Sequence, residues 1–275
     1  MEDLVCCAAR VRSLLTWRGD VLNTSDDALA RDLAWAAGER LLALRSASAE
    51  RDPAELRKAG DQSSHEFLMA ELRRLRPADA VLSEEGKDDP ARLSARRVWI
   101  VDPLDGTREF GEAGRSDWAV HVALWQDGEL AAGAVALPAQ GRVLSTVPGG
   151  VPAVSAPAQG LPLRILVSRS RPPEFVQRLA AIVGGVLVPL GSAGAKAAAV
   201  IAGDADAYVH SGGQYEWDSA APVAVAQAAG LHASRVDGSQ LCYNQPSPYV
   251  PDLLLCHPAR ASSLLAAIAV ARTDF

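Results

Sequence analysis

The chain has 275 residues, of which 49% are hydrophobic and 22% are charged, and its formal net charge is −6. A chain of this length can bury a sizeable core, either as one large domain or as two closely packed halves. The acidic balance, together with the lack of a Lys/Arg stripe interleaved with aromatic residues, excludes a nucleic-acid scaffold, so no nucleic-acid partner is expected. Small anionic substrates stay possible, because bound metal ions can supply positive charge.

No membrane span and no signal peptide are expected. The uncharged stretch at residues 179–195 is interrupted by glycines and a proline, and the N-terminus has no basic region before an apolar segment. The cysteines form no Cys-x-x-Cys pair, and the five histidines are scattered. We therefore expect a cytoplasmic protein without a zinc site, whose cysteines are reduced and buried: Cys6, Cys7, Cys242 and Cys256.

The first half of the chain is predicted to mix helices and strands. Apolar periodicity predicts helices at residues 4–15, 28–46 and 63–75. Asp61 is placed to cap the third of these helices, after a polar segment at 47–61. Runs rich in β-forming residues predict strands at 80–83, 98–101, 119–125, 130–137 and 142–146, with a hairpin turn at 126–129.

The second half is predicted to alternate strands with helices. A segment rich in Pro, Gly and Ala at 148–162 marks the boundary. Beyond it, strands are expected at 163–168, 186–190, 205–209 and 253–256, and helices at 173–183, 193–202, 219–229 and 259–271. The sequence thus predicts an α/β protein with an α+β half at 1–150 and an α/β half at 160–275.

The strand at 98–101 ends in two aspartates three residues apart, Asp102 and Asp105. Pro103 lacks a backbone N–H and is expected to stop regular strand pairing, so the two carboxylates lie at a strand end and turn. Gly106 permits close approach of a ligand, and Thr107 adds a hydroxyl group. This combination predicts a ligand site rather than a simple hairpin.

Two other acidic segments can join this turn. Glu84 and Glu85 follow the strand at 80–83, and Asp218 precedes a long apolar run, where it is placed as a helix N-cap. Taken alone, the glutamates are equally compatible with a solvated surface, and Asp218 with a capping role. Together, oxygen ligands without His or Cys are typical of Mg²⁺, which often bridges protein carboxylates and substrate phosphates. This pattern suggests metal-assisted hydrolysis of phosphate esters.

A further motif, Gly191-Ser192-Ala193-Gly194-Ala195-Lys196, lies between a predicted strand and a predicted helix. It lacks the length and the Gly-Lys-Ser/Thr ending of a P-loop, which argues against a nucleoside triphosphatase. Its backbone amides could bind an anion at the helix start, or its glycines could simply allow tight packing of strand and helix.

In their order and spacing, these motifs resemble the inositol monophosphatase superfamily of metal-dependent, lithium-sensitive phosphatases. The resemblance covers nearly the whole chain and rests on Glu84-Glu85, Asp102-Pro103-Leu104-Asp105-Gly106-Thr107 and Trp217-Asp218-Ser219-Ala220-Ala221. It implies a layered αβαβα sandwich, in which the first half carries most metal ligands and the second carries Asp218 and the substrate loops.

Within the superfamily, the chain most resembles the CysQ-type 3′(2′),5′-bisphosphate nucleotidases. Arg108-Glu109-Phe110 follows Asp-Gly-Thr as in that branch, and the segments at 166–170 and 191–196 are also similar to it. His210 stands where inositol phosphatases usually carry a Glu that holds sugar hydroxyls.

The resemblance implies a role for each matching residue. Glu84, Asp102 and the carbonyl of Leu104 would bind a first Mg²⁺, and Asp102, Asp105 and Asp218 a second. Asp61 and Thr107 would orient and deprotonate the attacking water, with Glu84 assisting through a third ion. The amides of 191–195 would hold the phosphate, and residues 168–171 or Lys196 the second phosphate, although Arg169 and Arg171 could equally be solvated surface groups. The full set of implied substrate contacts is Gly106, Thr107, Arg108, Ser168, Arg169, Ser192, Gly194, Lys196 and His210.

The implied reaction is Mg²⁺-dependent removal of the 3′-phosphate from 3′-phosphoadenosine 5′-phosphate, giving AMP, in sulfate assimilation. The sulfated analogue PAPS would give APS in the same way, and Li⁺ would inhibit. Inositol 1-phosphate and fructose 1,6-bisphosphate are alternative substrates for the same machinery. A non-catalytic phosphonucleotide sensor is an alternative of another class, and the resemblance also suggests a homodimer.

Overall fold

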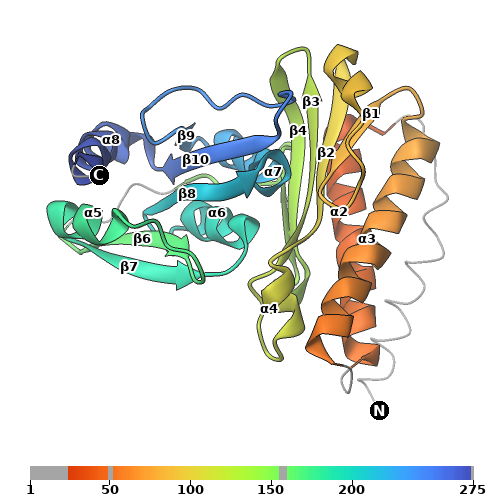
Figure 1. Cartoon of the computed structure of the whole chain (residues 1–275), viewed down its shortest axis with the longest axis horizontal. Coiled ribbons are helices and arrows are strands. Elements are labelled where there is room, and N and C mark those ends of the chain that lie inside the picture. Colours follow the sequence, from red (N-terminus) through yellow and green to blue (C-terminus); the bar gives the residue numbers. More distant parts are fainter. Residues whose placement is uncertain (1–23, 49–51, 155–159, 274–275) are drawn as a thin grey trace.

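The computed structural model describes residues 24–48, 52–154 and 160–273 (Figure 1). The helix predicted at 4–15 lies outside the described residues, as do Cys6 and Cys7. No helix in the described part of the chain is long and apolar enough to cross a membrane.

The first sheet has five strands in the order β1-β2-β3-β4-β5. Strands β1 and β2 are parallel, and the other neighbours are antiparallel. Its elements are α2 (Asp26–Ala47), α3 (Pro53–Leu75), β1 (Ala80–Ser83), β2 (Arg97–Asp105), α4 (Thr107–Gly111), β3 (Ala119–Gln126), β4 (Glu129–Leu137) and β5 (Arg142–Ser145). Short 3₁₀ helices lie at Pro90–Ser94 and Pro138–Gln140.

The second sheet has five strands in the order β7-β6-β8-β10-β9. Strand β6 is parallel to β7 and β8, whereas β10 is antiparallel to β8 and β9. Its elements are β6 (Leu163–Ser168), α5 (Val176–Val183), β7 (Gly185–Leu190), α6 (Ala193–Ala202), β8 (Ala207–Tyr215), α7 (Glu216–Ala228), β9 (His232–Ser234), β10 (Tyr249–Cys256) and α8 (Pro258–Arg272).

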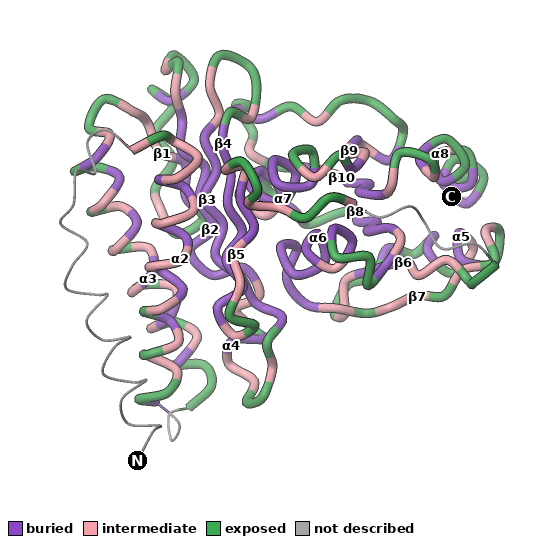
Figure 2. The backbone as a smooth tube through the Cα atoms, turned by 180° about the vertical axis from the view of Figure 1, so that it is seen from behind, coloured by how far each residue is buried: buried purple, intermediate pink, exposed green. Residues whose placement is uncertain are grey.

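The elements stack in five layers (Figure 1). Helices α2 and α3 cover one face of the first sheet, α6 and α7 lie between the two sheets, and α5 and α8 cover the far face of the second sheet. The interfaces between layers are buried, while the outer surfaces of the helices are exposed (Figure 2). The predicted αβαβα sandwich is confirmed.

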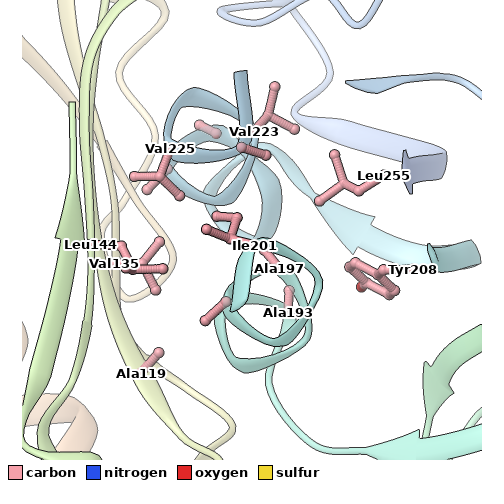
Figure 3. Close-up of a cluster of buried hydrophobic side chains, with 14 of the residues drawn as sticks. Ala119, Val135, Leu144, Ala193, Ala197, Ile201, Tyr208, Val223, Val225 and Leu255 are labelled. Atoms are coloured by element: carbon pink, nitrogen blue, oxygen red, sulfur yellow. The ribbon is translucent and has the colours of Figure 1, made fainter. Parts of the chain in front are cut away.

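The middle interface holds residues from both sheets in one apolar cluster (Figure 3). Val135 of β4, Ile201 of α6, Val223 of α7 and Leu255 of β10 belong to it. This shared core fixes α7, which carries Asp218, against the first sheet. The division into halves at 1–150 and 160–275 stays a prediction.

Two predicted helix caps are wrong. Helix α3 begins at Pro53, with Asp52 as N-cap accepting from the amide of Ala54 at 3.0 Å, so Asp61 lies inside the helix. Proline at the first helical position favours this earlier start. Asp218 lies in the first turn of α7 rather than at the cap, and its carboxylate accepts from the amide of Tyr215 at 2.7 Å.

Two further expectations concern β2 and the cysteines. The pairing of β2 with β3 shifts its register between Asp102 and Asp105. Regular pairing is thus interrupted at Pro103, as predicted, although the strand itself continues to Asp105.

Of the two described cysteines, Cys256 is buried as expected, but Cys242 is exposed. Cys242 lies in an irregular segment between β9 and β10, where it is exposed although its neighbour Tyr243 is buried.

Gly133 lies where β4 and α7 approach each other closely. A Cβ atom added there would lie 2.6 Å from Cβ of Ala224. We expect Gly133→Leu to lower the free energy of unfolding by about 1–3 kcal/mol through overpacking. Urea unfolding tests this, with Ala131→Leu at an exposed position of the same strand as control. Equal, small effects of both substitutions would contradict the packing of α7 on β4.

Candidate active site

The turn after β2 is shaped by its own backbone. Oδ1 of Asp102 accepts a hydrogen bond from the amide of Leu104 at 3.0 Å. Gly106 then adopts φ +84°, and a side chain there would approach the carbonyl of Asp117 and Cβ of Ser192, each at 3.2 Å. Glycine is therefore required both for its conformation and for space. It turns the chain directly into α4, which begins with Thr107.

Carboxylates from three elements converge at this turn. Oxygens of Asp102, Asp105 and Asp218 all lie within 4.8 Å of one another. Glu84 joins them from the end of β1, where its amide donates to the carbonyl of Val101 at 3.3 Å and its side chain hydrogen-bonds with Asp102. Parallel pairing of β1 with β2 and the packing of α7 on the first sheet thus bring together residues far apart in sequence.

Burial and mutual repulsion change the acidity of this cluster. Burial and the neighbouring carboxylates raise the pKa of Asp102 well above its ordinary value. Burial first, and then Asp218, raise the pKa of Glu84 to about 8. Burial together with Asp105 raises the pKa of Asp218 to about 7. So many buried acids cannot all be ionised at neutral pH without a compensating cation.

Asp105 is the exception in the cluster. Burial acts to raise its pKa, but His121, Lys196 and Ser192 outweigh burial and hold the pKa below its ordinary value. Its Oδ2 lies 3.1 Å from Nε2 of His121, and it accepts from the amide of Gly194 at 2.8 Å and from the hydroxyl of Ser192. Several hydrogen-bond donors thus fix the orientation of the Asp105 carboxylate.

The donor set fits a hard divalent cation. All the converging side chains offer oxygen, and the Leu104 carbonyl lies in the same turn. That carbonyl accepts from the hydroxyl of Thr107 at 2.9 Å, which leaves it a second lone pair. Buried carboxylates with raised pKa values are stabilised most strongly when a cation replaces their protons.

Asp61 and Thr107 meet beside this cluster. Oγ1 of Thr107 lies 3.3 Å from Oδ1 of Asp61. Burial and the nearby Glu85 raise the pKa of Asp61 to about 6. Gly60 lets α3 approach this closely, because a Cβ there would lie 2.8 Å from the ring of Phe110. Asp61 therefore reaches Thr107 from the interior of α3 and not from its N-cap.

A cavity of about 270 Å³ opens next to Asp105 and Asp218. Most of the predicted substrate contacts line it, namely Gly106, Thr107, Arg108, Ser168, Arg169, Ser192, Lys196 and His210. Gly194 lies behind the cavity wall, where a Cβ would be 2.3 Å from Nε2 of His121.

Several amides expected to hold the phosphate are already used inside the protein. Gly191 donates to Asp117 at 2.8 Å, Gly194 to Asp105 at 2.8 Å, and Ala195 to the Ser192 hydroxyl at 2.9 Å. Ala193 lines the cavity in the first turn of α6, where amides lack an acceptor within the helix. The glycines of this loop thus serve both packing and internal hydrogen bonding.

Sequence reasoning did not identify His121. It is fully buried, and its Nδ1 lies 3.2 Å from the carbonyl of Trp217 while Nε2 faces Asp105. His121 therefore connects the turn after β2 to the start of α7. The one signal that could have found it is strand register, because it pairs directly with Asp102 across β2 and β3.

The raised pKa values predict a pH-dependent stability of the metal-free protein. The folded protein binds protons at Asp218 up to about pH 7 and at Glu84 up to about pH 8, whereas the unfolded chain has already lost them. The free energy of unfolding should therefore fall as pH rises from about 6.5 to 8 in chelator.

Thermal unfolding in chelator measures this dependence, and Glu84→Gln should weaken it. Added Mg²⁺ should restore the wild-type unfolding midpoint at pH 8, because a cation bound by the folded state stabilises it. A midpoint that rises with pH across this window, or that does not respond to Mg²⁺, would contradict the assignment of the cluster.

Comparison with known proteins agrees with this geometry. The sequence model of the inositol monophosphatase family matches residues 23–272. A 3′-phosphoadenosine 5′-phosphate phosphatase of Mycobacterium leprae (strain TN) is 52% identical over 261 residues, which cover 89% of this chain and 93% of that protein. The 3′(2′),5′-bisphosphate nucleotidase CysQ of Escherichia coli (strain K12) is 34% identical, over 67% of this chain and 78% of its own.

Among solved structures, CysQ from Bacteroides thetaiotaomicron superposes with a TM-score of 0.70 at 25% identity, covering 88% of this chain and 98% of that chain. It is described as a bacterial member of the inositol monophosphatase family. The fold, the acidic cluster and the match over nearly the whole chain lead to one conclusion. This chain belongs to the inositol monophosphatase family.

Proposed function

We propose that this protein is a Mg²⁺-dependent phosphomonoesterase that converts 3′-phosphoadenosine 5′-phosphate to AMP and phosphate, and PAPS to APS. The observation that carries the proposal is the group of buried carboxylates beside a cavity that is lined by cationic side chains. The substrate is inferred from the relatives, since the M. leprae protein is named for this nucleotide and the E. coli protein for 3′(2′),5′-bisphosphates. A role in sulfate assimilation follows from the same inference.

The proposed metal ligands are the residues of the acidic cluster. Glu84, Asp102 and the Leu104 carbonyl would hold one ion, and Asp102, Asp105 and Asp218 a second, and Glu84 would also assist through a third ion. When bound, Mg²⁺ supplies an activated water and neutralises charge on the leaving oxygen. Inhibition by Li⁺, a homodimer and a cytoplasmic location stay predictions.

Asp61 and Thr107 are the proposed proton-handling pair. The Thr107 hydroxyl lies between the Leu104 carbonyl at 2.9 Å and Asp61 at 3.3 Å, so its proton can be passed to Asp61 when Oγ1 itself takes a proton from water. With a pKa of about 6, Asp61 is ionised at neutral pH and can act as the terminal base. No covalent phosphoenzyme is required.

The pair gives a direct test by substitution. Thr107→Ala should lower kcat by about 10²–10⁴-fold, because it removes the group through which Asp61 acts. Thr107→Ser keeps the hydroxyl and should retain most activity, which makes it the matched control. Steady-state phosphate release measures both variants. Activity of Thr107→Ala close to wild type would contradict the assigned role.

Substrate choice is tested by comparing phosphate release from 3′-phosphoadenosine 5′-phosphate, inositol 1-phosphate and fructose 1,6-bisphosphate, with Mg²⁺ and with chelator. The proposal predicts at least about a 100-fold higher kcat/KM for the nucleotide, a discrimination of about 2.7 kcal/mol. Similar values for inositol 1-phosphate or the sugar bisphosphate would contradict this choice. No Mg²⁺-dependent release from any substrate would favour a non-catalytic sensor.

A further inference from the structure

Two of the proposed metal ligands come from different parts of the fold. Glu84 follows β1 in the first sheet, whereas Asp218 lies in the first turn of α7, between the two sheets (Figure 1). When both carboxylates are ionised, their charges repel each other and push the two segments apart unless a cation lies between them. A connection between the segment after β1 and the start of α7 would oppose this repulsion.

Arg92 provides one end of such a connection. It lies in the 3₁₀ helix at Pro90–Ser94, and its side chain is only 1% exposed. Its Nε and Nη2 donate to the carboxylate of Asp88 at 2.6 and 3.1 Å, which orders the loop between β1 and this helix. Its Nη1 donates to Oδ1 of Asn244 at 2.7 Å, and Nη2 also donates to the carbonyl of Gln245 at 2.9 Å. Arg92 thus joins the segment after β1 to the segment before β10.

Glu216 holds the same segment at the start of α7. It is the first residue of the helix and is 1% exposed. Its two carboxylate oxygens accept hydrogen bonds from the consecutive amides of Asn244 and Gln245, each at 2.7 Å. Its own amide donates to the carbonyl of Pro248 at 2.7 Å. These bonds attach the first turn of α7 to the segment between β9 and β10, which extends from the second sheet toward the first (Figure 1).

Asn244 connects the two ends. Its φ is +57°, a left-handed conformation that asparagine and glycine adopt more readily than other residues. In this conformation its amide donates to Glu216, while its side chain makes two hydrogen bonds with Arg92. Oδ1 accepts from Nη1, and Nδ2 donates to the Arg92 carbonyl at 3.2 Å. We name this network the Arg92–Glu216 clamp, which consists of Arg92, Asn244, Gln245 and Glu216.

The composition of the Arg92–Glu216 clamp favours a positioning role over a purely stabilising one. Burying a guanidinium group and a carboxylate carries a desolvation cost that apolar side chains of similar size avoid. Hydrogen bonds, however, have a preferred length and direction, so they specify where the first turn of α7 lies. Each end of the clamp is also close in sequence to a proposed metal ligand, since Arg92 orders the loop that begins at Glu84 and Glu216 shares a helical turn with Asp218.

A second connection reaches the start of α7 from the first sheet. The carbonyl of Trp217 lies 3.2 Å from Nδ1 of His121, and Nε2 of the same ring lies 3.1 Å from Oδ2 of Asp105. His121 therefore relates the start of α7 to Asp105, and the Arg92–Glu216 clamp relates it to the segment that carries Glu84. Together the two connections place Asp218 relative to both of these acids.

We propose that the Arg92–Glu216 clamp holds Glu84 and Asp218 at the separation that Mg²⁺ binding needs, and that Arg92, Asn244 and Glu216 are positioning residues for the metal site. Ligands that are already in place need little rearrangement when the cation binds, so the clamp raises the affinity for Mg²⁺. This inference rests on the metal site of the proposed function and is independent of the substrate.

The test is a titration of metal-free protein with Mg²⁺ alone, followed by thermal unfolding. The Mg²⁺ concentration that gives half of the rise in unfolding midpoint should be about 10-fold higher for Glu216→Gln and for Asn244→Gly than for wild type. Glycine tolerates the φ of residue 244 and keeps its amide, so Asn244→Gly removes only the side-chain bonds to Arg92. This milder variant decides the test if Glu216→Gln does not fold.

Asp206→Asn is the matched control. The Asp206 carboxylate also accepts from a backbone amide and an arginine, the amide and Nε of Arg164 at 2.8 and 3.0 Å. Asp206 precedes β8, however, whereas Glu216 follows it, so the control lies at the opposite end of the strand. Asp206→Asn should lower the unfolding midpoint in chelator without changing the Mg²⁺ concentration that is required.

Steady-state kinetics and a double variant complete the test. At saturating Mg²⁺, kcat of Glu216→Gln and Asn244→Gly should stay within about threefold of wild type, while the Mg²⁺ concentration for half-maximal rate rises about 10-fold. Because both residues act through one network, the double variant should need little more Mg²⁺ than the weaker-binding single variant.

The outcomes separate this inference from the proposed function. If both clamp variants lower the midpoint in chelator but need no more Mg²⁺ than wild type, the clamp is only structural and the inference is overturned. Effects on the Mg²⁺ requirement that multiply in the double variant would also overturn it, as would a wild-type midpoint that does not respond to Mg²⁺. If wild type responds to Mg²⁺ but does not hydrolyse the nucleotide, only the proposed function fails, and a weaker Mg²⁺ response of the clamp variants still supports the inference.

Discussion

The rest of the structure must offset the free-energy cost of holding several carboxylates together inside the protein. Asp102, Asp105 and Asp218 are brought within 4.8 Å of one another, and Glu84 hydrogen-bonds with Asp102. Without a cation, burial and mutual repulsion favour protonated acids, which is why the pKa values of Glu84 and Asp218 rise to about 8 and about 7. Such a cluster opposes folding unless it serves a ligand. The layers of the sandwich supply the stability, since three apolar cores enclose the sheets on both sides.

The basic residues around the cavity divide into two groups with different tasks. Some stabilise the walls, as Arg169 does by pairing with Glu109 and Glu112, and as Arg115 does by pairing with Asp117, which in turn accepts from the Gly191 amide. These contacts hold α4 and the loop before α6 in fixed positions. Arg108 and Arg171 line the cavity and are exposed. These side chains place positive charge beside the cavity in a protein whose net charge is acidic.

Much of the site could be predicted from sequence because its central motif is local. Asp102 to Thr107 form one continuous strand end and turn, so their proximity follows from the chain itself. Glu84 and Asp218 required the resemblance to a family, since only parallel pairing of β1 with β2 and the packing of α7 bring them close. The alternation of elements in the second half predicted an α/β architecture there, whereas the order of the layers was implied by the resemblance to the family.

Other features depended on contacts between distant segments. Asp61 looked like a helix cap because the polar residues before it hid the real start at Pro53, where Asp52 caps the helix. His121 carries no spacing signal, and its place beside Asp105 appears only once β3 is aligned with β2. Arg169 looked like a phosphate ligand because its partner Glu109 lies 60 residues away in sequence. Local pattern identifies the chemistry of a residue, but tertiary contacts decide whether it is available.

The most direct test of the account is identification of the products formed from 3′-phosphoadenosine 5′-phosphate in water enriched in ¹⁸O with Mg²⁺ present. Mass spectrometry should find unlabelled AMP with its phosphate at the 5′ position, and inorganic phosphate that carries one ¹⁸O atom, because water attacks the 3′-phosphorus at the acidic cluster. Adenosine 3′-monophosphate as product, label in the nucleotide, or no hydrolysis at all would contradict the central claim.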